Sequence, residues 1–164
     1  MRTLFSKKFV FSRKGIRLRH VFYIGTIMER QAEAFYRRFA EKAQDDDMRE
    51  LYRELAEEEV QHFKLINGQL SRWKSLPIDK RDLEAMDADG KLRQMFLSPP
   101  DTNATRKEII DYAMDQEAKM VAFYESFEKE FNDFWKSAKL QALVTEEKTH
   151  IRKLSDMLAG RRTD

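Results

Sequence analysis

The chain of 164 residues contains no cysteine, three prolines, five glycines and only three histidines. Without cysteine there can be no disulfide, no thiolate metal site and no cysteine nucleophile. The scarcity of proline and glycine leaves little turn chemistry for a many-stranded sheet and favours long helices. The composition therefore predicts an all-α protein. A chain of 164 residues has the length of one domain, and this length is enough to bury a core without metal or disulfide crosslinks.

Long apolar runs are also missing. The longest uncharged stretch near the start, VFYIGTIM at residues 21–28, is far shorter than the roughly 20 residues that cross a bilayer as a helix. We therefore expect a soluble protein. The lack of cysteine fits a reducing compartment, so we expect the cytoplasm.

Acidic residues are absent from the first 28 positions, although the whole chain has 31 basic and 29 acidic residues. Residues 1–20 form a basic N-terminal arm with interleaved apolar residues and no secretory cleavage site. Two interpretations stay open. The arm packs its apolar residues on its own domain, or it contacts an acidic surface such as a membrane face or a partner protein. Nucleic acid is not an expected partner.

Apolar residues recur at three- and four-residue steps in four segments, which is the helical period. The first helix is expected at residues 21–43, and the second runs from the acidic QDDD at 44–47 to about Trp73. TRKE at 105–108 matches a capping box and opens a third helix. A break near Asn132 and Asp133 separates it from a fourth helix that ends near Leu158.

The stretch between these helix pairs, residues 75–103, has three prolines, an Asp-Gly pair and no sustained period. It predicts a long crossover with a short helix around residues 91–96. Two antiparallel helical hairpins joined by a long crossover make a four-helix bundle. We assign this domain to residues 21–164.

The two hairpins are related by an offset of 88 residues. From residue 29 to residue 62, 10 of 34 positions are identical to those 88 further on, without a gap. This predicts an internal repeat, residues 21–74 and 105–160. The phrase LAEEEVQHFKL at 55–65 thus returns as LVTEEKTHIRKL at 143–154.

Each copy of this phrase contains Glu-x-x-His, as Glu59 with His62 and Glu147 with His150. Residues three apart on a helix are neighbours on one face, so each pair presents a carboxylate oxygen and an imidazole nitrogen to one centre. This is a typical spacing for metal ligands. The glutamates that precede the pairs, Glu58 and Glu146, either orient the histidines or face solvent.

A further glutamate lies on the first helix of each half, Glu29 and Glu117, seven residues before Tyr36 and Tyr124. Four carboxylates that converge in an interior repel one another and lose solvation, and two divalent cations would neutralise them. We therefore predict a dinuclear site that suits iron or manganese and does not exclude zinc. The tyrosines are either hydrogen-bond donors to these ligands or core residues. Four methionines are expected in the core: Met28, Met48, Met114 and Met120.

At these residues the sequence resembles the rubrerythrin family of the ferritin-like superfamily, over about residues 21–158. ERQAEAFYRRFAEKA and LAEEEVQHFKL, echoed by EAKMVAFYESFEKE and LVTEEKTH, are similar to its two di-iron half-sites. The resemblance implies a ferritin-like bundle that reduces hydrogen peroxide, or dioxygen, at two iron ions. The implied ligands, which would act in catalysis through the metals, are Glu29, Glu59, His62, Glu117, Glu147 and His150.

Two departures from the family pattern matter. The chain has no cysteine for a rubredoxin domain, so electrons are expected from a separate donor protein. Met120 stands where well-studied rubrerythrins have an extra glutamate, which brings the site nearer to the symmetric set of other ferritin-like oxidases. A ferroxidase that handles iron is therefore one alternative, and a non-enzymatic helical interaction module is another. The resemblance also predicts a homodimer, in which the long crossover would allow hairpin exchange.

Overall fold

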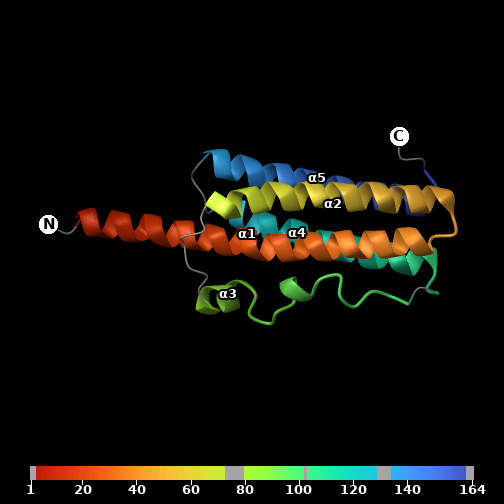
Figure 1. Ribbon diagram of the computed structural model, residues 1–164, viewed down its shortest axis with the longest axis horizontal. Coiled ribbons are helices and arrows are strands. Elements are labelled where there is room, and N and C mark those ends of the chain that lie inside the picture. Colours follow the sequence, from red (N-terminus) through yellow and green to blue (C-terminus); the bar gives the residue numbers. More distant parts are fainter. Residues whose placement is uncertain (1–2, 73–79, 102, 129–133, 162–164) are drawn as a thin grey trace.

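The computed structural model describes residues 3–72, 80–101, 103–128 and 134–161. Within them α1 packs along α2, and α4 packs along α5, so that two antiparallel hairpins form one bundle (Figure 1). The predicted all-α four-helix bundle with a long crossover is therefore confirmed. Its long helices are α1 (Thr3–Lys42), α2 (Asp46–Arg72), α4 (Arg106–Glu128) and α5 (Phe134–Leu158).

Helix α1 begins far earlier than predicted, at Thr3 instead of about Val21. The start was wrong because basic and apolar residues interleave there without a helical period, although nothing in that stretch breaks a helix. In Figure 1 this first part of α1 projects beyond the ends of the other helices. The two interpretations of the arm concern the side chains of residues 1–18, which lie outside the described side chains.

The predicted starts of α2 and α4 are confirmed by hydrogen bonds at their first turns. The Thr105 N–H donates to Glu108 at 2.7 Å and the Glu108 N–H donates to the Thr105 hydroxyl at 3.2 Å, which is a capping box. At α2, Asp45 Oδ1 accepts the N–H groups of Asp47 at 2.9 Å and Met48 at 3.4 Å. The expected break near Asn132 lies outside the described residues.

The crossover contains a short helix, α3 (Lys80–Met86), and a 3-10 turn, η1 (Leu92–Gln94). The turn lies where a short helix was expected, whereas α3 was not predicted, since seven residues are too few to show a period. Phe96 is buried at a positive φ of 62°, and its N–H donates to Gln116 of α4 at 2.9 Å. The crossover is thus anchored on the bundle.

The core between the hairpins is apolar at both ends and polar in the middle. Met28, Met48 and Met120 are buried and Met114 packs against the core, as expected. Aromatic rings cluster around Phe35, which lies 4.6 to 5.6 Å from four neighbouring ring centroids. None of the described helices combines the length and the apolar character that would let it cross a membrane.

Candidate metal centre

Six acidic and imidazole side chains meet in the middle of the bundle, where an apolar core would be expected. They are at most 3% exposed. Two come from each of α2 and α5, and one from each of α1 and α4. We call this set the Glu/His cluster, and its members are the six ligands that the resemblance implies: Glu29, Glu59, His62, Glu117, Glu147 and His150.

The Nδ1 atom of His62 faces three carboxylates from three helices. It lies 3.4 Å from Glu29 of α1, 3.3 Å from Glu59 of α2 and 2.9 Å from Glu147 of α5. The ligand atoms of the two Glu-x-x-His pairs all lie within 4.8 Å of one another. One small cation would therefore reach donors from both hairpins.

His150 repeats this environment from the other side. Its Nδ1 lies 3.1 Å from Glu59, 3.7 Å from Glu117 and 3.1 Å from Glu147. The two imidazole rings are stacked with centroids 5.3 Å apart and an interplanar angle of 15°. Glu59 and Glu147 are thus shared by both histidines, whereas Glu29 and Glu117 each approach only one.

Eight buried atoms of the Glu/His cluster have no hydrogen-bond partner among the described residues. They are one oxygen each of Glu29 and Glu117, both oxygens of Glu59 and Glu147, and Nδ1 of both histidines. Their close contacts lack the angles of hydrogen bonds. Buried polar atoms left without partners cost free energy unless an ion or water satisfies them. Six carboxylate oxygens and two imidazole nitrogens directed at one centre fit two divalent cations such as iron or manganese.

The four carboxyl groups are equally buried but differ in their pKa values. Burial and then the charge of Glu147 raise the pKa of Glu29, while burial and then the charge of Glu59 raise that of Glu117. Burial also opposes ionisation of Glu59 and Glu147, but contacts with the imidazoles outweigh it and lower both pKa values. Without cations, the cluster therefore favours the protonated form of Glu29 and Glu117 and the ionised form of Glu59 and Glu147.

The histidines complete this charge balance. Burial lowers the pKa of an imidazole, but the contacts of His62 with Glu147, Glu29 and Glu59 raise its pKa instead. The charge of Glu59 and contacts with Glu117 and Glu147 do the same for His150. Two imidazolium groups then balance two carboxylates, and two divalent cations would balance four carboxylates after the protons leave.

The outer nitrogen of each histidine contacts a carboxylate from the opposite hairpin. His62 Nε2 lies 2.6 Å from Glu146, and His150 Nε2 lies 2.9 Å from Glu58. These contacts turn Nδ1 toward the other carboxylates, which is the arrangement that orients a metal-binding imidazole. Of the two interpretations offered for Glu58 and Glu146, the geometry favours orientation of the histidines.

The two tyrosines also reach across the bundle. The hydroxyl of Tyr36 donates to Glu117, and that of Tyr124 donates to Glu29 at 2.5 Å. Burial and the neighbouring carboxylates raise the pKa of both phenols, so both remain protonated donors. Each tyrosine therefore supports the glutamate of the other half, although sequence spacing had placed it on the face of its own.

Two supporting residues were missed by the sequence reasoning. Lys153 donates to Glu58 at 2.8 Å and to Glu54 at 2.6 Å. Although burial opposes it, the contacts of Glu58 with His150 and Lys153 lower its pKa to about 2. A Cβ atom on Gly25 would lie 3.0 Å from the Tyr124 hydroxyl, so this glycine gives the phenol room. Its only signal was its place inside a helix, where glycine is costly.

Comparison with known proteins agrees with this geometry. No curated protein and no solved structure gives a significant match to the chain. The family model described as Rubrerythrin matches residues 23–158, a range that contains all four long helices of the bundle except the start of α1. The chain therefore belongs to the rubrerythrin family.

Proposed function

We propose that this protein is a non-haem di-iron oxidoreductase that reduces hydrogen peroxide, or dioxygen, with electrons from a separate redox protein. The observation that carries the proposal is the set of eight buried, unpartnered oxygen and nitrogen atoms in the Glu/His cluster. Membership of the rubrerythrin family supports the same chemistry. Dioxygen and peroxide would both be oxidants of such a site.

The contacts suggest a role for each ligand. Glu59 and Glu147 approach both imidazoles, so they would bridge two iron ions. Glu29 and His62 would complete one ion, and Glu117 and His150 the other. Manganese or zinc would find the same donors.

Two ferrous ions bound there would supply two electrons, which together with two protons convert hydrogen peroxide to two water molecules. The chain's own residues prepare the site for that chemistry. The buried side chains exclude bulk water, so the electrostatic interactions inside are strong. The hydroxyls of Tyr36 and Tyr124 fix Glu117 and Glu29, and the outer carboxylates fix the imidazoles.

A ferroxidase is the second candidate, and Met120 is the observation that favours it. This residue is fully buried, lies three positions after Glu117, and offers no carboxylate. Its counterpart in the first half is Ala32, which is also buried. Neither position thus supplies a fifth carboxylate to the six ligands, and a symmetric site would suit the oxidation of ferrous iron by dioxygen.

Metal analysis and two assays separate these functions. The purified protein is loaded anaerobically with ferrous iron, and we expect two ions per chain. A peroxidase then consumes hydrogen peroxide in many turnovers when a chemical reductant is supplied. A ferroxidase instead accumulates ferric product from excess ferrous iron without a reductant. Glu125→Gln, on the exposed side of α4, is the matched control for substitutions of cluster glutamates.

Failure to bind any transition metal would contradict both functions and would favour the non-enzymatic interaction module. The proposed peroxidase also needs two electrons per turnover, so a separate electron-donor protein is part of the proposal. We further propose a homodimer, with hairpin exchange through the crossover, from the family resemblance. Light scattering on the purified chain would test that assembly.

A further inference from the structure

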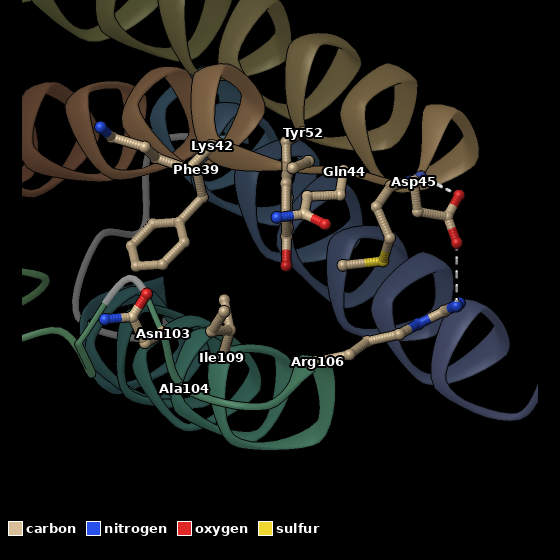
Figure 2. Close-up of a pocket in the computed structure, with 11 residues that line it drawn as sticks. Phe39, Lys42, Gln44, Asp45, Tyr52, Asn103, Ala104, Arg106 and Ile109 are labelled. Atoms are coloured by element: carbon tan, nitrogen blue, oxygen red, sulfur yellow. Dashed lines mark hydrogen bonds and ion pairs between the residues drawn. The ribbon is translucent and has the colours of Figure 1, made fainter.

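A second feature of the bundle lies at the end where α1 turns into α2 and α4 begins. There a cavity of about 380 Å³ opens between the helices (Figure 2). Its buried floor is formed by Phe39, Met48, Tyr52 and Ile109. None of its lining residues belongs to the Glu/His cluster. The volume lies in the range of sites for small organic molecules, and the floor has the apolar character that such sites share.

Tyr52 gives this cavity a specific polar group. Its side chain is 1% exposed, yet its hydroxyl has no hydrogen-bond partner among the described residues. Figure 2 shows the hydroxyl directed into the space between the helices. A buried hydroxyl without a partner costs free energy, so a phenylalanine would pack there at lower cost unless something accepts the hydrogen bond.

The internal repeat makes the same point. The residue 88 positions after Tyr52 is Leu140, which is fully buried. An apolar side chain therefore serves the equivalent core position in the second hairpin. Packing in the second hairpin thus does not require a hydroxyl at this position.

The charges around the cavity indicate an uncharged occupant. The guanidinium of Arg106 contacts Asp45 at 3.4 Å and donates to the carbonyl of Met157 at 2.5 Å, so both charges are paired. Lys42 points its amine away from the cavity in Figure 2. The remaining polar groups at the rim, Gln44 and Asn103, are neutral amides.

We propose that this cavity binds a small uncharged aromatic molecule that carries a carbonyl or ether oxygen. The ring would lie among Phe39, Met48 and Ile109, since aromatic rings and thioethers pack favourably against one another. The oxygen would accept the hydrogen bond that Tyr52 donates to no other described residue. This inference goes beyond the proposed oxidoreductase and does not rest on it.

Titration of the full chain with two probes of similar shape tests the proposal. Acetophenone has the carbonyl oxygen, and ethylbenzene lacks it. Ligand-observed NMR should show that Tyr52→Phe weakens acetophenone binding about three- to tenfold, the loss of one hydrogen bond, and leaves ethylbenzene binding unchanged. Tyr112→Phe is the matched control, because Tyr112 does not line this cavity and its substitution should change neither affinity.

Two further measurements keep the result interpretable. Tyr52→Phe should not lower the midpoint of thermal unfolding, because it removes a hydroxyl without a partner. Ile109→Phe should fill the cavity and abolish binding of both probes. Equal acetophenone affinity for the unaltered chain and Tyr52→Phe would overturn the proposal. So would acetophenone binding weaker than about 10 mM to the unaltered chain, which is too weak for a specific binding site.

Discussion

The two half-sites have the same inner ligands but different outer supports. Glu58, which contacts His150, is 36% exposed and is bound by Lys153. Glu146, which contacts His62, is 56% exposed and has no such lysine among the described residues. The position equivalent to Lys153 in the first hairpin is occupied by Leu65. The inner metal-binding pattern is thus repeated in both halves, while the support of the outer carboxylate differs between them.

A second difference lies beside the tyrosines. Gly25 leaves room for the Tyr124 hydroxyl, whereas the equivalent residue in the second half is Ala113. Both phenols nevertheless donate to a glutamate of the opposite half. The same hydrogen bond is thus made in both halves, although one half has glycine and the other alanine at this position.

Acidification should have the largest effect on metal affinity, and it should lower the affinity of both halves equally. In the metal-free cluster, the pKa values of Glu29, His62, Glu117 and His150 are all raised, so in each half protons compete with a cation for one carboxyl group and one imidazole. Each divalent cation must displace such protons, so its affinity should fall as the pH is lowered. Calorimetry in buffers of different ionisation enthalpy counts these protons. Release of different numbers of protons on binding of the first and the second cation would show that the two halves are not equivalent.

Removal of a shared carboxylate should be the most damaging substitution. Glu59→Ala or Glu147→Ala takes a ligand from both cations, so we expect metal affinity and activity to fall by at least about 100-fold. His62→Ala should instead reduce the iron content toward one ion per chain. Elemental analysis measures these stoichiometries, with Glu125→Gln as the control. Two ions per chain in Glu147→Ala would contradict the shared role.

Loss of an outer carboxylate should weaken metal binding unequally in the two halves. Supports of this kind change metal affinity by about 10- to 100-fold. We expect Glu58→Gln to lower metal affinity by an amount near the upper end of this range, because Glu58 is less exposed and is bound by Lys153. Glu146→Gln should lie near the lower end. Competition with a chelator measures both, and an equal or larger effect of Glu146→Gln would show that the supports are equivalent.

The smallest expected effect comes from Gly25→Ala. The new methyl group would lie 3.0 Å from the Tyr124 hydroxyl and would displace it from Glu29, so we expect a loss of about 1 kcal/mol in the free energy of unfolding. Gly68→Ala is the matched control in α2, where nothing lies within 4 Å of the added atom. It should stabilise the protein by about 0.5 to 1 kcal/mol. If urea unfolding showed the same stabilisation for both variants, Gly25 would not be needed to make room for the Tyr124 hydroxyl.

The long helices and the two Glu-x-x-His pairs could be predicted because their signals are local, whereas Glu29 and Glu117 were identified through the internal repeat and the family resemblance. A Glu-x-x-His pair fixes two neighbours on one helix face, and a capping box fixes a helix start within four residues. The outer supports could not be predicted in this way. The contacts of Tyr36 with Glu117, and of Glu58 with His150, join residues 81 and 92 positions apart along the chain. They depend on how the two hairpins pack, which no local spacing records.

The early start of α1 and the presence of α3 show two other limits. Residues 3–20 are helical without an apolar period, so periodicity alone placed the helix start too late. Helix α3 has seven residues, fewer than two full repeats of the period. In both segments the helix could not be detected from apolar periodicity, the signal by which the four long helices were predicted.

The reciprocal contacts between the hairpins have a consequence for how such a chain can arise. One hairpin alone carries a glutamate and a Glu-x-x-His pair, but the tyrosine and outer carboxylate that steady them belong to the other. An ancestral single hairpin could complete these contacts only by associating with a copy of itself. Fusion of the two copies by the crossover then places both hairpins in one chain, and it frees each copy to acquire its own substitutions.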